Sequence, residues 1–167
     1  VYAEKLRQLN IPFEMAGKVN LGTSNILREI SILLEAIIDP ADQVKLVAVL
    51  RGIFFGFSDN QLFIFKHNGG LFDYRSKVNK DIPYNEYVSF RKAYIKLKKY
   101  RFWLKKYSVM MSIEKIFEDC GAYLYPYCDN EGDHQRGTLT YIMEYLTSKT
   151  VSGANSVTDI LSALKDI

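Results

Sequence analysis

The chain has 167 residues, of which 48% are hydrophobic and 25% are charged, and its formal net charge is +3. This apolar content is enough for a folded core, which excludes an intrinsically disordered chain and fits one domain, or one domain with a short attachment. The apolar runs are shorter than the ~20 residues of a transmembrane helix, so we expect no membrane association. Two cysteines are too few for a disulfide scaffold and favour a reducing, cytoplasmic setting.

The N-terminal end predicts a small helix–strand unit. Residues 1–9 have the pattern of an amphipathic helix, and Ile11, Phe13 and Met15 alternate with other residues as in a short strand. Pro12 restricts this strand to a sheet edge or a strand start. Because the chain lacks an initial methionine and enters a helix at once, we expect it to be part of a longer protein.

Two helices are predicted next. Residues 24–38 carry apolar side chains at helical spacing. Asp39 can then cap a second helix, with Pro40 at its first position and Asp42 adding a negative charge to its first turn. This second helix is expected to end at Gly52.

A third helix and the longest helix follow. Ser58 and Gln61 have the spacing of a capping box, so a helix is predicted to begin there and to end at residues 69–70, which are both glycine. Residues 73–83 are predicted to form a polar loop. Residues 84–107 are predicted to form the longest helix.

The C-terminal third predicts three more helices. Ser112 can cap a helix that Gly121 ends. Residues 123–133 have no regular pattern, residues 137–147 are predicted to be helical, and Ser156 can cap a last helix that reaches the end of the chain.

The predicted fold is therefore mainly α, with about seven or eight helices and one short N-terminal edge strand. We place a domain boundary near residue 20, where the helix–strand unit of residues 1–20 gives way to the all-helical residues 21–167.

The longest predicted helix has an apolar stripe and a basic face. The stripe is formed by residues at three- and four-residue steps, with three apolar neighbours beside it: Tyr87, Phe90, Tyr94, Leu97 and Leu104, with Val88, Ile95 and Phe102. The basic face consists of Lys92, Lys96, Lys99 and Lys106, widened by Arg91, Lys98, Arg101 and Lys105. A face of one charge sign repels itself and predicts an anionic partner, although an exposed basic face without a partner is the alternative. Tyr100 and Trp103 are candidates for stacking on bases, or else core residues.

The sequence offers no catalytic or metal site. Gly17–Lys18 lacks the upstream glycine and the following Ser or Thr of a phosphate loop. Residues 73–77 resemble the Asp-Tyr-Lys-Thr run of RecB-type nucleases, but no second or third carboxylate accompanies them in a preceding strand, which favours a plain loop. Cys120, Cys128 and His134 do not have the spacing of zinc ligands, and Cys120 is expected to be a small buried residue.

A specific resemblance begins at residues 37–59, which read IIDPADQVKLVAVLRGIFFGFSD. This segment is similar to a stretch of RecB/AddA-type helicases with Pro-x-Asp, then Val-Leu-Arg, then Phe-Gly-x-Ser-Asp. Residues 2–13 and the layout of residues 136–146 and 157–164 are similar to the same proteins. The chain thus resembles subdomain 2B, with a short piece of motor domain 2A at residues 1–20, of a UvrD/Rep-type superfamily 1 helicase. The closest resemblance is to the RecB/AddA helicase–exonucleases (exodeoxyribonuclease V).

The resemblance implies an accessory subdomain that contacts duplex DNA and regulates unwinding during DNA repair and recombination. ATP and magnesium would bind in other domains of the parent enzyme, and this chain would need no cofactor of its own. The expected partners are duplex or forked DNA, without sequence specificity, the remaining helicase domains and a second helicase–nuclease subunit. A helical module that only docks such a subunit is the alternative, and a stand-alone enzyme is the least favoured reading.

The turn formed by Gly56, Phe57, Ser58 and Asp59 enters a predicted helix and is a candidate DNA-backbone contact. The N–H groups and partial positive charge of a helix N-terminus favour a phosphate, and a small residue permits close approach. Alternatively, Gly56 only permits the turn and Ser58 only caps the helix. UvrD has Arg-Gly-Ile-Gly at this turn, and relatives have Phe-x-x-Arg-x-Glu where this chain has Ser24–Ile26. The roles of those Arg and Glu residues therefore do not carry over.

Overall fold

The computed structural model describes residues 25–124 and 132–166. These residues form seven helices, and no strand lies among them: α2 (Asn25–Ile38), α3 (Gln43–Arg51), α4 (Asp59–His67), α5 (Tyr84–Lys106), α6 (Val109–Cys120), α7 (Gly132–Val151) and α8 (Val157–Lys165). The predicted mainly α class is confirmed. The predicted helix at 1–9, the edge strand at 11–15 and the boundary near residue 20 lie outside the described residues. None of the helices described is long and apolar enough to cross a membrane.

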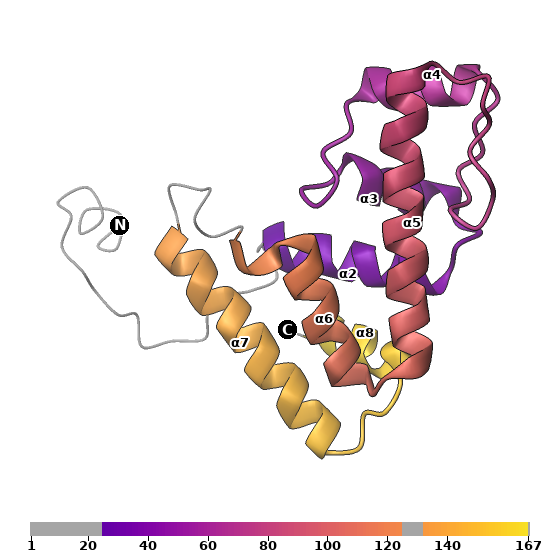
Figure 1. Cartoon of the computed structure of the whole chain (residues 1–167). Helices are drawn as coiled ribbons and strands as arrows, with labels where there is room; N and C mark the ends of the chain where they lie inside the picture. Colours follow the sequence, from indigo (N-terminus) through magenta and orange to yellow (C-terminus); the bar gives the residue numbers. More distant parts are fainter. Residues whose placement is uncertain (1–24, 125–131, 167) are drawn as a thin grey trace, which may run out of the picture.

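Helix α2 is at the centre of the core. Half of its residues are fully or almost fully buried, and it packs against α3, α5, α7 and α8. Figure 1 shows α5 standing across α2, with α4 near the N-terminal end of α5 and α6 folding back from its C-terminal end. Exposed residues recur from Arg91 to Lys106, so one side of this part of α5 is not covered by the described helices.

The α4–α5 corner is held by an aromatic cluster. The rings of Phe65 and Phe90 stack with their centroids 3.7 Å apart, and Phe57 lies 4.5 Å from Phe90. Phe72 packs against Phe65 from the loop that follows α4, with centroids 5.4 Å apart. Buried aromatic pairs add to the hydrophobic stabilisation of a core. The cluster fixes the turn before α4 against the N-terminal half of α5.

Of the four residues predicted to cap helix N-termini, two are confirmed and two are wrong. The Ser58–Gln61 capping box forms with both of its hydrogen bonds, and Ser156 caps α8. Helix α3 is capped by Asp42, whose carboxylate accepts the Lys45 N–H at 3.0 Å, and not by Asp39. Asp39 instead accepts the Ala41 N–H in a turn, because the chain needs three more residues to change direction after α2.

The predicted cap at Ser112 is the second wrong start. Helix α6 already begins at Val109, and Ser112 is fully buried inside it. The Ser112 hydroxyl lies 2.9 Å from the carbonyl oxygens of both Trp103 and Ser108. It therefore ties α6 to the end of α5, and a buried hydroxyl needs such acceptors. Gly121 ends α6 in the left-handed conformation, as predicted.

The apolar stripe of α5 is narrower than predicted. Phe90, Tyr94 and Leu97 are buried, whereas Ile95 and Phe102 are 55% and 54% exposed. At 100° per residue, these two side chains point away from Leu97, so they cannot share its buried face. They lie instead in the middle of the outer, basic face.

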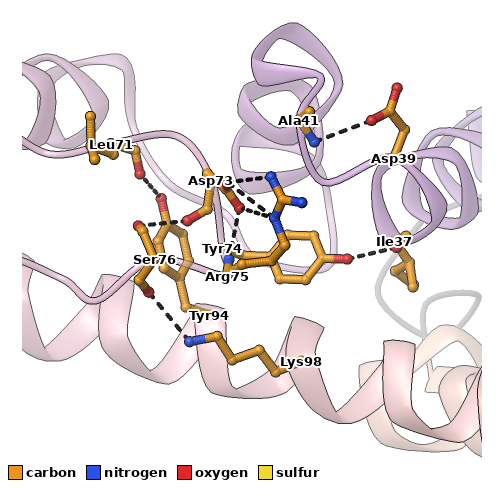
Figure 2. A network of polar contacts seen from close by, with 10 residues as sticks. All are labelled: Ile37, Asp39, Ala41, Leu71, Asp73, Tyr74, Arg75, Ser76, Tyr94 and Lys98. Carbon is orange, nitrogen blue, oxygen red and sulfur yellow. Dashed lines mark hydrogen bonds and ion pairs between the residues drawn. The ribbon is translucent and has the colours of Figure 1, made fainter.

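The loop between α4 and α5 is less polar than predicted. Tyr74 is completely buried, and its hydroxyl donates to the carbonyl oxygen of Ile37 at the end of α2, at 2.6 Å. From α5, the Tyr94 hydroxyl donates to the carbonyl oxygen of Leu71, also at 2.6 Å. Figure 2 shows the loop held between α2 and α5 by these bonds. These two hydrogen bonds therefore hold the loop in place between α2 and α5.

Candidate nucleic-acid interface

The basic residues of α5 cover its outer face. Eight lysines and arginines lie between Arg91 and Lys106, without an acidic residue among them. Five of these side chains are exposed and three are half-buried. Because each residue turns the helix by about 100°, most of them fall on two flanks. The first flank consists of Lys92, Lys96 and Lys99, and the second flank consists of Lys98, Arg101 and Lys105.

The first flank meets the predicted turn in one open pocket. Gly56 and Phe57 line this pocket, of about 290 Å³, together with Lys92 and Lys96 of α5. The remaining lining comes from Phe54, Phe55, Gln61, Ser89 and Ala93. Gly56 and Lys92, which are 36 positions apart in the sequence, are therefore brought together. Ser58, Asp59, Arg91, Lys99 and Lys106 do not line the pocket.

Gly56 serves the geometry of the turn. Its φ angle of +66° belongs to the left-handed region that glycine favours, and a Cβ atom added there would meet nothing within 4 Å. Its N–H donates to the carbonyl oxygen of Gly52 at 2.8 Å, and that of Phe57 donates to Leu50 at 2.9 Å. Phe57 itself is buried against Phe90, so its side chain belongs to the core. The turn is rigid, and these two amides are not available to a ligand.

The N-terminus of α4 is only partly open to an anion. The Gln61 N–H donates to the Ser58 hydroxyl at 3.2 Å, and the Ser58 N–H donates to the Gln61 side chain at 3.0 Å. A phosphate at this end could therefore bind only the N–H groups of Asp59 and Asn60. The Asp59 carboxylate is balanced by Arg51, whose Nε lies 3.0 Å away. The turn is a weaker anion site than its sequence predicts, and the lysines of the pocket are its stronger feature.

One carboxylate neutralises part of the first flank. Asp119 of α6 accepts from Lys99 Nζ at 2.6 Å and from the Tyr100 hydroxyl at 2.9 Å, and Lys96 Nζ lies 3.9 Å from it. Partial burial alone would raise the pKa of Asp119. The hydrogen bonds from Lys99 and Tyr100 outweigh that effect, so the pKa lies below its ordinary value. Lys99 is thus a structural residue that joins α5 to α6 as well as a charge on the face.

The two aromatic candidates for base stacking have different outcomes. Tyr100 is completely buried, so it cannot stack on a base, and that hypothesis is wrong for this residue. Trp103 is half-buried, and its ring has Lys99 Nζ at 5.0 Å and Lys115 Nζ at 5.8 Å from its centroid. Lys99 is held in this place by its ion pair with Asp119, so this side of the ring is not open to a base.

Arg91 and Lys106 lie along the middle of the outer face of α5, between the two flanks, and we call this strip the crest. Arg91 is exposed and makes no ion pair with the described residues, and the same holds for Lys92. Lys106 lies over the exposed ring of Phe102, with Nζ 5.3 Å from the ring centroid. These side chains are free to rearrange around a partner. The crest therefore combines mobile positive charges with exposed apolar groups.

The candidate catalytic residues of the sequence that the structure describes are buried or held in other contacts. Burial raises the pKa of the Cys120 thiol to about 11, so it is protonated at neutral pH and a poor nucleophile. The Asp73 carboxylate is held by the Arg75 guanidinium through bonds of 2.6–3.1 Å. Within residues 25–124 and 132–166, no group of three His, Cys, Asp or Glu side chains could hold a metal ion. Cys128 and the side chain of His134 lie outside the described residues.

No protein-family model matches the chain, and no curated protein is significantly similar to it. The site must therefore be read from its own geometry. The sequence predicted the first flank and the turn, but it missed that Arg75 of the loop lies beside the second flank. The spacing of Lys98, Arg101 and Lys105 was the only available signal for that side of the helix.

Proposed function

We propose that this chain is a non-catalytic accessory domain of an ATP-dependent DNA helicase or helicase–nuclease, and that α5 holds the backbone of duplex or forked DNA. The observation that carries the proposal is the outer face of α5, where eight basic residues occur without an acidic residue among them. The nearby carboxylates of Asp119 and Asp73 are each paired with a basic side chain, Lys99 and Arg75 respectively. A face of one charge sign costs self-repulsion, which an anionic partner relieves. The proposal includes a cytoplasmic location.

The geometry of the face suits a regular polyanion. Arg91 to Lys106 spans about 24 Å of helix, and adjacent phosphates of one DNA strand lie roughly 3.4 Å apart along the axis. The exposed side chains alternate between the flanks and the crest, so they can reach several phosphates of a strand. Contact with about three or four phosphates would give a log–log salt slope of roughly −3 to −4. Such contacts position DNA without reading its sequence.

The resemblance of residues 37–59 to RecB/AddA-type helicases supplies the biological setting. Motor domains elsewhere in the parent protein would bind ATP and magnesium and perform the chemistry. Residues 1–20 would be a piece of motor domain 2A, and the remaining residues would form the 2B-like subdomain. This domain would regulate unwinding during DNA end processing and recombinational repair.

A second candidate function is the docking of a partner subunit. The observation that favours it is the exposure of Ile95 and Phe102 in the middle of the basic face. Apolar side chains ringed by charges are typical of protein interfaces. A docking surface of this kind would bind a partner subunit in a way that raising the salt concentration weakens little.

The test is the titration of the chain with a fluorescent forked duplex at several salt concentrations. Arg91 and Lys92 are the residues to reverse, because both are exposed and neither makes an ion pair with the described residues. Lys99 is unsuitable, since a glutamate at that position would face Asp119 and weaken the α5–α6 contact. The variant R91E/K92E is expected to lose most of the affinity and about two units of salt slope.

The matched control is K66E/K80E, which changes the charge equally at two exposed positions away from α5. It is expected to bind the duplex almost as well as the unchanged chain. Equal losses in both variants would show attraction by net charge alone and would contradict a specific role for α5. An absence of binding even at low salt would exclude the DNA contact and leave the docking function.

A further inference from the structure

The second flank of α5 borders a cavity of its own. This cavity has a volume of about 290 Å³ and lies between the loop after α4 and the C-terminal half of α5. It is lined by Tyr74, Arg75, Lys98, Arg101, Phe102 and Lys105. We call it the Arg101 cavity. It has no lining residue in common with the pocket beside Gly56.

The charge of the Arg101 cavity is one-sided. Four of its six lining residues are cationic and none is acidic. The nearest compensating carboxylate is that of Asp73, and it is already held by Arg75, with Arg75 Nη2 at 2.6 Å. Lys98, Arg101 and Lys105 make no ion pair with the described residues. The cavity therefore retains an excess of positive charge that an anion would balance.

One group inside the cavity lacks a partner. Arg101 Nη1 is buried and makes no hydrogen bond within the described part of the chain. Buried polar groups in folded proteins are nearly always hydrogen-bonded, so an unpaired guanidinium nitrogen needs an explanation. The planar donors of arginine match the oxygen atoms of a phosphate. Because Nη1 has almost no exposed surface, a rotation of the Arg101 side chain toward the cavity would bring it to a phosphate oxygen.

The walls of the cavity are preformed. The Tyr74 hydroxyl donates to Ile37 of α2, and Lys98 Nζ donates to the carbonyl oxygen of Ser76 at 3.3 Å. Arg75 is fixed by Asp73, as Figure 2 shows. Binding of a ligand would therefore cost little conformational entropy, because the side chains of the site are already ordered.

The cavity also has an apolar side. Phe102 lines it and is 54% exposed, with the Nζ of the exposed Lys106 5.3 Å from its ring centroid. Aromatic side chains beside a basic groove are the surfaces on which bases stack. The volume is at the lower end of the range of small-molecule sites, about 300 Å³, which suits one nucleotide.

We propose that the Arg101 cavity binds the phosphate group of a single nucleotide, with the base against Phe102. The nucleotide is either part of a nucleic-acid strand or free in solution, and the cavity chemistry is the same for both. This proposal depends on the proposed function only if the nucleotide is part of a DNA strand. Binding of a free nucleotide does not depend on it. The site itself stands on the four cationic groups, the unpaired Arg101 nitrogen and the exposed ring.

The experiment is an NMR titration of the whole chain, following the arginine side-chain N–H signals. The probes are adenosine monophosphate, inorganic phosphate and a short single-stranded oligothymidylate. We expect adenosine monophosphate to shift the Arg101 and Arg75 signals to saturation, and inorganic phosphate to bind more weakly. Saturation that is absent, or equal affinity for both compounds, would overturn the nucleotide assignment.

The variants use exposed residues so that the fold is kept. K98Q/K105Q is expected to weaken nucleotide binding by roughly tenfold, because each lost ion pair is solvent-screened and modest. The matched control K66Q/K80Q removes the same charge at two exposed positions outside the cavity and is expected to change affinity by less than about twofold. Equal weakening in both variants would contradict the site.

The oligothymidylate distinguishes the two sources. Competition between the oligothymidylate and adenosine monophosphate identifies a strand as the ligand, and an absence of competition identifies a free nucleotide. Failure of the proposed function is seen separately, as duplex binding that R91E/K92E leaves unchanged. The proposed function and the nucleotide site can therefore be contradicted independently of each other.

Discussion

At the scale of single residues, glycine is required at position 56 by the backbone conformation and not by a lack of room for a side chain. Its φ of +66° strains any residue with a Cβ, although nothing lies within 4 Å of that position. Gly56→Ala is therefore expected to lower the free energy of unfolding by about 1–2 kcal/mol. Gly137→Ala, in helix α7 with equally open surroundings, is expected to raise it by about 0.5–1 kcal/mol. Urea denaturation of the two variants measures both, and equal signs would contradict the assignment of strain to Gly56.

Asp119 is the residue whose protonation should matter most to the α5–α6 contact. Its folded pKa is lowered, because the bonds from Lys99 and Tyr100 outweigh the effect of burial. A lowered folded pKa means that Asp119 stabilises the fold above its unfolded pKa, about 4, and that this contribution is lost as the pH falls through the folded pKa. Asp119→Asn is expected to cost about 1–2 kcal/mol at pH 7.

The same variant should cost less in acid. The difference in unfolding free energy between Asp119→Asn and the unchanged chain is expected to begin to shrink below about pH 4, where Asp119 of the unfolded chain takes up a proton, and to disappear below the lower folded pKa. Urea denaturation at pH 7 and at pH 3 checks this. Asp159→Asn should show a similar pH dependence at the α8 capping box, because the hydrogen bond from Ser156 also lowers the pKa of Asp159. A difference that is constant with pH would mean that Asp119 acts through packing alone.

At the scale of elements, features that depend on neighbouring residues in the sequence were predicted correctly, whereas features that depend on how the helices pack were not. The Ser58–Gln61 box is a matter of neighbouring residues, and its two bonds form as predicted. Ser112 has the same local preference, but its hydroxyl is used 9 residues back, at Trp103, where α6 meets α5. The positions of Ile95 and Phe102 were misread because they were grouped with the apolar stripe for their hydrophobicity, although at 100° per residue they point away from Leu97. Only the packing of α5 against α2, α4 and α6 decides which side is buried.

The loop between α4 and α5 behaves as a structural element although it is irregular. Tyr74 joins it to α2 through a buried hydrogen bond of 2.6 Å. Tyr74→Phe leaves the Ile37 carbonyl oxygen without this donor and is expected to cost about 1–2 kcal/mol. Hydrogen exchange should then quicken at the Ser76 amide, which donates to Asp73 within the loop. Tyr84→Phe, at a 78% exposed position, serves as the control and should change neither quantity.

At the scale of the whole molecule, the candidate interface follows from how the helices are arranged. The sequence shows the basic residues of α5 and the turn before α4, but it does not show that Gly56 and Lys92 line one pocket. That meeting depends on Phe57 and Phe65 packing against Phe90. Likewise, the Arg101 cavity exists because Tyr74 holds the loop beside α5. Charge could be read from the sequence, whereas its distribution between two cavities could not.

A helix face that binds an anion carries like charges that repel each other. When no anion is bound, this repulsion should lower the stability of the protein. Lys92 and Lys96 are four residues apart on α5, so their like charges destabilise the helix. Lys92→Glu would replace this repulsion with an attraction in the favourable orientation and is expected to add about 0.5 kcal/mol. A thermal midpoint higher by about 1–2 °C should follow, together with weaker binding of a forked duplex.

Lys66→Glu is the control for this last prediction. It makes the same charge change in the last turn of α4, where a negative charge opposes the helix dipole, so it should lower the thermal midpoint and leave duplex binding nearly unchanged. Scanning calorimetry and the forked-duplex titration give the two quantities for each variant. Opposite effects of Lys92→Glu on stability and on binding are the signature of charge retained for a partner. A loss of stability in Lys92→Glu would instead mean that Lys92 supports the fold itself.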